Sequence, residues 1–193
     1  MKRSKQLLGA VSTIALIAFS ASPALAGGST AGSSITNNVS VSFDVGGVTQ
    51  TAVTASNTFT VDRKIDVLVD FAGTAATSVA PGAQNQVLAF DVTNLSNAVV
   101  DIRLAAALNV GNAANIANFE VYRDTNGDRS LSAAELAAGP ITYLDEVAAD
   151  GTFAVIVIAD IGLGAVNGNE FDVVLTGTAS EGRTAGTQGA AIT

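Results

Sequence analysis

The sequence contains no cysteine, no histidine and no tryptophan, and aromatic residues make up only 5% of its 193 residues. The absence of cysteine excludes a disulfide framework, thiol chemistry and a lipid anchor on an N-terminal cysteine. The absence of histidine removes the commonest general base and the commonest zinc ligand. Because aromatic side chains are also the usual sugar platforms, the composition disfavours most hydrolase schemes.

Basic residues are scarce as well, and three of the nine lie at the N-terminus. The basic start at residues 2–5 precedes an apolar stretch at 7–19, and Ala-Leu-Ala at 24–26 forms a small-x-small cleavage site. This order predicts an export signal over residues 1–26, cleaved after its last alanine. An uncleaved membrane anchor is the alternative, but the serines and proline at 20–23 interrupt the apolar run before it reaches the roughly 20 residues of a span.

Cleavage of the predicted leader would leave 167 residues, enough for one domain with a hydrophobic core. Six basic and 17 acidic residues would remain, a formal charge of −11. A surface of this charge repels nucleic acid and anionic lipid and attracts divalent cations. We therefore expect an exported protein of the periplasm, the cell surface or the exterior, with no nucleic-acid partner and no membrane span after cleavage.

Apolar and polar residues alternate with a period of two through most of the remaining chain, which predicts half-buried strands. Gly-Gly, Pro-Gly, Asp-Gly and Asn-Gly pairs separate these strands as turns. The pattern predicts an all-β fold, an Ig-like antiparallel β-sandwich over residues 34–180. A flexible lead at 27–33 precedes the predicted sandwich, and a mobile tail at 181–193 follows it.

Two segments interrupt the strand pattern. The alanine-rich segment 104–118 could be a helix, but its asparagines and glycine favour a loop. Residues 133–138 predict one short helix, which ends at Gly139 and Pro140.

A calcium loop is predicted between Asp124 and Glu135. Oxygen-bearing side chains occupy loop positions 1, 3, 5, 7, 9 and 12, which is the ligand spacing of an EF-hand. These ligands are Asp124, Asn126, Asp128, Ser130, Ser132 and Glu135. Glu135 would close the site with both carboxylate oxygens, and Ser130 would contribute its backbone carbonyl. The competing interpretation is an ordinary polar turn, which uses the same residue types.

Two further residues of this loop affect the prediction. Leu131 at position 8 is the apolar residue expected to fix the loop to its support. Arg129 stands at position 6, where the sharp turn normally requires glycine. A residue with a Cβ at positive φ costs on the order of 1 kcal/mol, so we expect weaker calcium binding.

Two stretches resemble modules of exported bacterial proteins. Residues 86–97, Gln-Val-Leu-Ala-Phe-Asp-Val-Thr-Asn-Leu-Ser-Asn, and the apolar strand at 99–104 resemble the conserved-repeat Ig-like domains of those proteins. The segment 34–62 is similar to a lead-in of the same family. The resemblance implies an Ig-like sandwich on or outside the cell and implies no reaction.

The predicted loop resembles an EF-hand only over residues 124–136. An EF-hand has a helix entering its loop, whereas residues 118–123 alternate like a strand. A paired switch needs two helices that change their angle. The loop is therefore expected to act as a structural calcium staple.

Together these features predict an exported calcium-binding structural or adhesive protein of the cell surface or biofilm matrix. A sharper hypothesis is a filament subunit that self-associates by adding its N-terminal strand to a neighbour's sheet. The interpretation we favour makes that strand the first of the chain's own sandwich. A periplasmic calcium buffer or sensor is the alternative function.

An enzyme is not expected. The most plausible reaction would be glycoside hydrolysis by two carboxylates, and the candidates are Asp91, Asp101, Asp160 and Asp172. Acidic residues of alternating strands usually lie on the solvated face, which disfavours this reaction.

Overall fold

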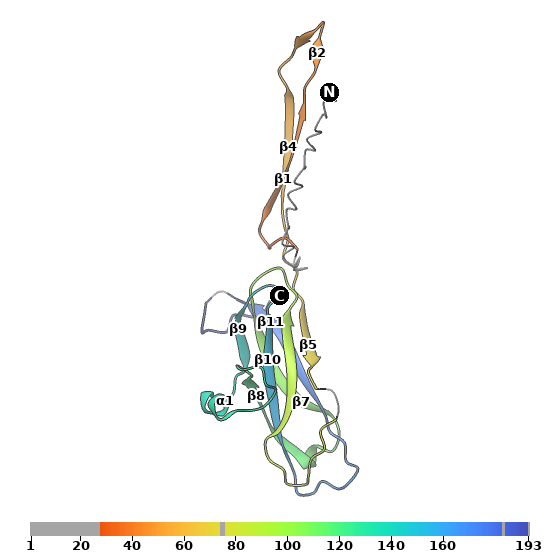
Figure 1. Ribbon diagram of the computed structural model, residues 1–193, viewed down its shortest axis with the longest axis vertical. Helices are drawn as coiled ribbons and strands as arrows, with labels where there is room; N and C mark the ends of the chain where they lie inside the picture. The colour runs from red at the N-terminus through yellow and green to blue at the C-terminus, as the bar shows by residue number, and fades with distance from the viewer. Residues whose placement is uncertain (1–27, 74–75, 183, 193) are drawn as a thin grey trace, which may run out of the picture.

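The computed structural model describes residues 28–73, 76–182 and 184–192. The predicted export signal lies outside these residues. The described chain forms a body of packed strands and a long arm that projects from one end of it (Figure 1). Its strands are β1 Ser34–Val41, β2 Asp44–Val45, β3 Val48–Thr49, β4 Val53–Thr60, β5 Val67–Phe71, β6 Gln86–Asn94, β7 Val100–Val110, β8 Ile116–Arg123, β9 Tyr143–Val147, β10 Thr152–Ile161 and β11 Asp172–Glu181.

The body is a sandwich of two antiparallel sheets. One sheet has the order β5-β6-β10-β8, and the other has the order β11-β7-β9. Alternate residues of each strand point between the sheets, so that Val155 and Val157 of β10 lie in the core with Phe90 and Val92 of β6. The predicted all-β class and antiparallel sandwich are confirmed.

The outer face of the four-stranded sheet carries a second apolar cluster. Tyr122 of β8 and the buried Ile156 and Ile158 of β10 form this cluster, and Leu131 and Val87 pack against it. Leu131 therefore fixes the loop that follows β8 to the sheet, as its apolar character predicted.

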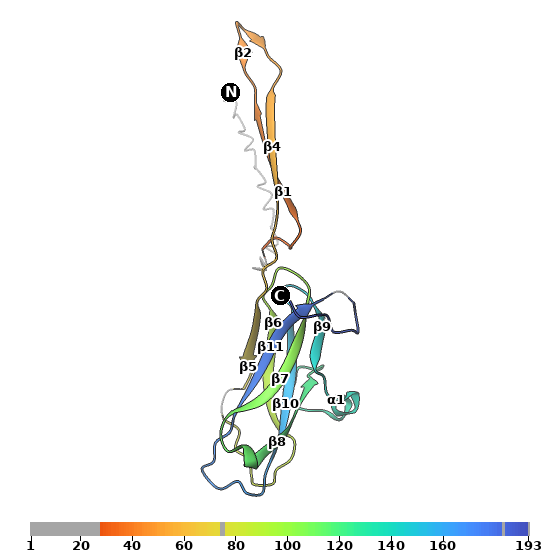
Figure 2. The ribbon, with the colours of Figure 1, turned by 180° about the vertical axis from the view of Figure 1, so that it is seen from behind.

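The arm is a two-stranded ribbon of β1 and β4. The register runs from Ser34 opposite Thr60 to Val41 opposite Val53, and β2 and β3 pair at the tip. Every residue of β1 and β4 is exposed, and both views of the molecule show the ribbon standing away from the sandwich (Figure 2).

The predicted sandwich boundary at residue 34 therefore needs correction. The sandwich begins at β5, and β1 is not its first strand, because β1 pairs with β4 in a sheet of their own. A period of two predicts a strand with one apolar face. It does not determine which strand or core that face meets.

The alanine-rich segment 104–118 also differs from the prediction, since it is mainly a strand and not a loop. Strand β7 continues to Val110, and only residues 113–115 form a short 3-10 helix before β8. Leu104, Ala106 and Leu108 face inward, while the residues between them are exposed. Alanine on both faces conceals this alternation in the sequence.

The predicted short helix is confirmed as α1, Ala133–Ala138. Its N-cap is Ser132, whose hydroxyl and backbone exchange hydrogen bonds with Glu135 in a capping box. Among the described residues, no helix has the length and apolar content needed to cross a membrane.

The C-terminal tail folds back onto the sandwich. The amide of Glu181 donates to the carbonyl of Ala190 at 2.9 Å, and Ser180 forms a bridge with Ala191. Ile192 packs against the main core. The segment predicted to be a mobile tail thus contributes backbone pairing and apolar contact.

Candidate cation sites

The predicted calcium loop lies between two regular elements. At its start, the amide of Asp124 donates to the carbonyl of Ala154 at 3.1 Å, which continues the pairing of β8 with β10. At its end, Ser132 and Glu135 cap α1. Both ends of the loop are therefore held by the fold.

Asp124 organises the first half of the loop. Its side chain is buried, and its two carboxylate oxygens accept hydrogen bonds from the amides of Gly127 at 2.7 Å and Arg129 at 3.1 Å. Asn126 accepts from the amide of Asp128 at 3.0 Å in the same manner. These short-range bonds fold residues 124–129 into a turn, which contains the predicted ligands of the first half.

Glu135 organises the second half and is only 3% exposed. One carboxylate oxygen accepts from the amide and hydroxyl of Thr125, and the other accepts from the amide and hydroxyl of Ser132. The backbone hydrogen bonds, first from Ser132 and then from Thr125, lower the pKa of Glu135 to about 2. The carboxylate is consequently ionised at neutral pH and surrounded by four donors.

The loop supplies hard oxygen ligands, which suit calcium in chemistry. In the present conformation, however, its carboxylates mainly bind loop donors. Within the described part of the chain, only one group of three carboxylates has oxygens within 4.8 Å of one another, and this group is not in the loop. Calcium binding would require Glu135 to exchange the rotatable hydroxyls of Thr125 and Ser132 for the ion. The two backbone amides can remain in place.

Arg129 adopts the left-handed conformation that its position predicts, with φ of 63°. Its guanidinium binds the carboxylate of Asp91 on β6 at 2.7 and 3.1 Å. This ion pair gives the unusual residue at position 6 a structural role. The sequence alone does not reveal this pair, because the partners are 38 residues apart.

The group of three carboxylates consists of Asp101, Asp145 and Glu146. Asp101 is fully buried, and its oxygens accept from the amides of Glu146 and Gly189, both at 2.8 Å. One oxygen of Asp145 and one of Glu146 are buried without a hydrogen-bond partner. Two such oxygens beside a third buried carboxylate are suitable ligands for a divalent cation, without selecting calcium over magnesium.

A register shift between β7 and β9 assembles this cluster. Val100 lies opposite Val147 and Ile102 opposite Leu144, so two residues of β9 face one residue of β7. The alternating sequence pattern predicted that Asp101 lies on a solvated face. This prediction is wrong, because Asp101 is buried. The one available signal was the adjacent pair Asp-Glu at 145–146, which breaks the period of two in its strand.

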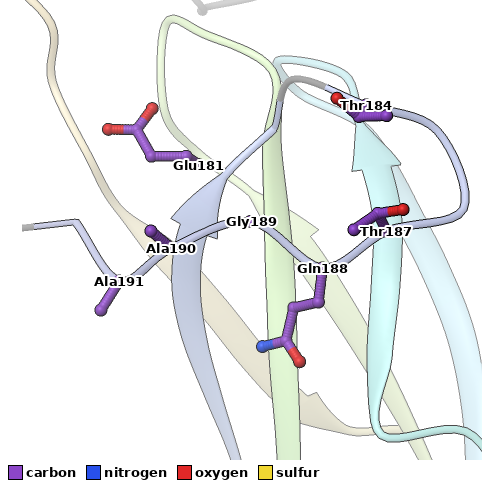
Figure 3. A pocket seen from close by; sticks show the side chains of 7 residues that line it. All are labelled: Glu181, Thr184, Thr187, Gln188, Gly189, Ala190 and Ala191. Atoms are coloured by element: carbon purple, nitrogen blue, oxygen red, sulfur yellow. The ribbon is translucent and has the colours of Figure 1, made fainter.

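The tail covers the cluster. Residues 187–191 pass beside the end of β11 in Figure 3, and the amide of Gly186 donates to Asp145 at 2.8 Å. A pocket of about 330 Å³ is lined here by Glu181, Thr184 and residues 187–191. Glu181 binds Arg63 at 2.7 and 2.9 Å, so the one charged side chain of this lining is paired.

The other candidate carboxylates have separate partners. Asp160 accepts from the side chain of Asn118 and the amide of Asn85, both at 2.8 Å, and these bonds lower its pKa. Asp172 accepts from the side chain of Asn109 at 2.7 Å. With Asp91 bound to Arg129, none of these three belongs to the carboxylate cluster.

The described residues thus define an all-β sandwich with a projecting ribbon and two sets of oxygen ligands. Comparison of the chain with protein-family models, curated proteins and solved structures gives no match. The resemblance to conserved-repeat Ig-like domains and to an EF-hand loop therefore stays a prediction.

Proposed function

We propose that this chain is an exported structural or adhesive protein of the cell surface or matrix, in which calcium at loop 124–135 stiffens the sandwich. The observation that carries this proposal is the attachment of the loop. It is held by β8 at one end, by the capped helix α1 at the other and by Leu131 on the outer sheet face. An ion in such a loop would mainly add stability, since no pair of helices is free to open.

The charge of the protein supports the same role for calcium. The chain after the predicted leader has a formal charge of −11, and several carboxylates lie in or near the loop. A bound divalent cation neutralises charges that repel one another in the folded state. Ion binding and folding stability are then linked.

The cluster of Asp101, Asp145 and Glu146 is a second position for the same cation. An ion there would join β7, β9 and the tail. The proposal therefore has two separable parts, a loop ion and a cluster ion, and each has its own variants.

Calorimetric titration with calcium, together with thermal melting, tests the proposal on residues 27–193. We expect binding heat and a higher melting temperature in excess calcium than in chelator. Asp128→Asn should weaken the loop signal, because an amide oxygen still accepts the hydrogen bond from Ser130 but the charge is lost. Asp44→Asn, at an exposed carboxylate of the arm, is the matched control.

Absence of both heat and stabilisation would exclude the calcium proposal. A calcium buffer or sensor is the alternative. A change of molecular dimensions in small-angle scattering on calcium addition would favour the sensor, because a staple changes stability while the shape stays constant.

A further inference from the structure

The arm has two chemically different faces. The register of β1 and β4 places the pairs Ile35–Phe59, Val39–Ala55 and Val41–Val53 on one face, interrupted by the pair Asn37–Asn57. The opposite face consists of serine, threonine and asparagine. A two-stranded ribbon with one apolar face is marginal in water by itself, so this face has the composition of a contact surface.

The tip of the arm carries further exposed apolar side chains. Phe43, Val45 and Val48 are 45%, 60% and 63% exposed around a Gly-Gly turn. Eight large apolar side chains of the arm are at least 36% exposed: Ile35, Val39, Val41, Phe43, Val45, Val48, Val53 and Phe59. Phe43, Val45 and Val48 lie at the tip, and the other five continue along one face of the ribbon.

An apolar groove lies where the two sheets part. Its volume is about 910 Å³, and its lining includes Phe71 of β5, Leu88 of β6, Ile161 of β10 and Val173 of β11. Folded cores contain few voids larger than a water molecule. A groove of this size between two sheets therefore lacks the packing partners that a completed core would have.

The arm and the groove lie at opposite ends of the long axis. The arm leaves the sandwich beside the start of β5, whereas the groove is formed by the ends of β5 and β10 and by the loop before β11 (Figures 1 and 2). The arm points away from its own groove. A contact between the two must therefore involve a second copy of the chain.

We propose that the tip of the arm, residues 43–48, occupies the groove of the next copy and joins the molecules head to tail. Such a contact is heterologous, so its repetition produces an open chain of molecules. The inference names the partner of the structural protein proposed above and rests on that function. It replaces addition of a single N-terminal strand, since β1 is already paired with β4.

Charge requires that Asp44 of the tip stays in water at the mouth of the groove, because Glu170 and Asp172 belong to the groove lining. The arm from residue 34 to 60 carries one charged residue, Asp44, so most of the acidic residues lie on the sandwich. Bodies of like charge repel at close range, but the effect is screened beyond about 10 Å. The arm extends over 13 residues from Ser34 to Gly46, about 40 Å at 3.3 Å per residue, and keeps successive bodies apart.

Directed disulfide formation tests the proposal, because the chain has no cysteine of its own. One preparation of residues 27–193 carries Val45→Cys in the arm tip, and a second carries Val166→Cys in the groove. Both side chains are exposed, at 60% and 65%, so the substitutions should leave the fold intact. Leu163→Cys is the matched control, at an exposed apolar residue of the same loop region outside the groove lining.

We expect a mixture of the Val45→Cys and Val166→Cys chains to give at least tenfold more cross-linked dimer than a mixture of Val45→Cys and Leu163→Cys chains. Cross-linking of Val45→Cys chains with one another as the main product would indicate a closed pair of arms and would overturn the proposal. Equal yields in the two mixtures, or monomers only, would overturn it as well.

The test is separable from the calcium proposal. Deletion of residues 34–60 should abolish the open chains while leaving any calcium-dependent melting of the sandwich. If the cross-link forms but calcium has no effect on melting, the assembly stands and the calcium role fails. If calcium stabilises the sandwich but no specific cross-link forms, the assembly fails alone.

Discussion

The guanidinium of Arg129 binds the carboxylate of Asp91 through two hydrogen bonds, and this pair joins the loop after β8 to the middle of β6. The pair explains why an arginine is compatible with a backbone position that favours glycine. The left-handed conformation costs on the order of 1 kcal/mol, and a partly exposed ion pair returns at most a similar amount.

Replacement of Arg129 separates these two effects. Arg129→Gly removes both the strain and the ion pair, so the free energy of unfolding should change little. Arg129→Ala removes the pair but keeps the strain, and should be about 1 kcal/mol less stable than Arg129→Gly. Urea denaturation measures both variants. Equal stability of the glycine and alanine variants would show that position 129 is unstrained.

The lowered pKa of Glu135 predicts an acid-dependent loss of stability. The folded carboxyl has a pKa of about 2, compared with an ordinary value near 4.5. The folded state therefore binds fewer protons, and the free energy of unfolding rises with pH in this window. This contribution is complete above pH 4.5 and is lost as the pH falls toward 2.

Thermal melting of the parent and Glu135→Gln between these pH values measures the effect. The variant should show a weaker pH dependence, because residue 135 no longer titrates. Glu170→Gln, at an exposed carboxylate, is the control and should follow the parent. Parallel pH profiles for the parent and the Glu135 variant would contradict the assignment.

Replacement of Glu146 in the carboxylate cluster should change the melting temperature in opposite directions with and without a divalent cation. In chelator, Glu146→Gln should raise the melting temperature by a few degrees, since it removes one charge from three neighbouring carboxylates. In excess calcium or magnesium the same variant should be less stable than the parent if the cluster holds the ion. Differential scanning calorimetry measures the melting temperatures of the variant and the parent in both conditions. If the difference between them is the same with and without the cation, the ion binds elsewhere.

Replacement of Asn94 should lower the free energy of unfolding. Its side chain is fully buried, and its amide nitrogen donates to the carbonyls of Ala98, Val147 and Ala148 at 2.9 to 3.1 Å. Asn94→Ala would remove this donor from all three carbonyls, of which that of Ala148 keeps a bond from the amide of Gly151, and should cost about 2 to 4 kcal/mol. Asn167→Ala, at an exposed loop residue, should cost less than about 0.5 kcal/mol in the same denaturation experiment.

Much of the local structure follows from the sequence. The strand before the loop, the helix at residues 133–138 and the anchoring by Leu131 were all predicted correctly, because they depend on alternation, capping and one apolar contact. The left-handed conformation at Arg129 was also predictable from its place in the loop.

The errors at the N-terminal strands and at Asp101 share one cause, which is the choice of the pairing partner. The sequence showed that β1 has an apolar face, but the pairing of β1 with β4 is a contact between distant residues. It showed that Asp101 alternates with apolar neighbours, but burial of Asp101 depends on the irregular pairing with β9 and on the returning tail.

The sequence by itself determined an all-β chain with a loop of oxygen ligands, because residue periodicity and ligand spacing are local properties. Only the tertiary structure decided that the N-terminal strands form an arm, that three carboxylates meet at a bulge, and that an apolar groove opens at the far end. Each of these depends on which distant segments pack together, and a local pattern leaves that choice open.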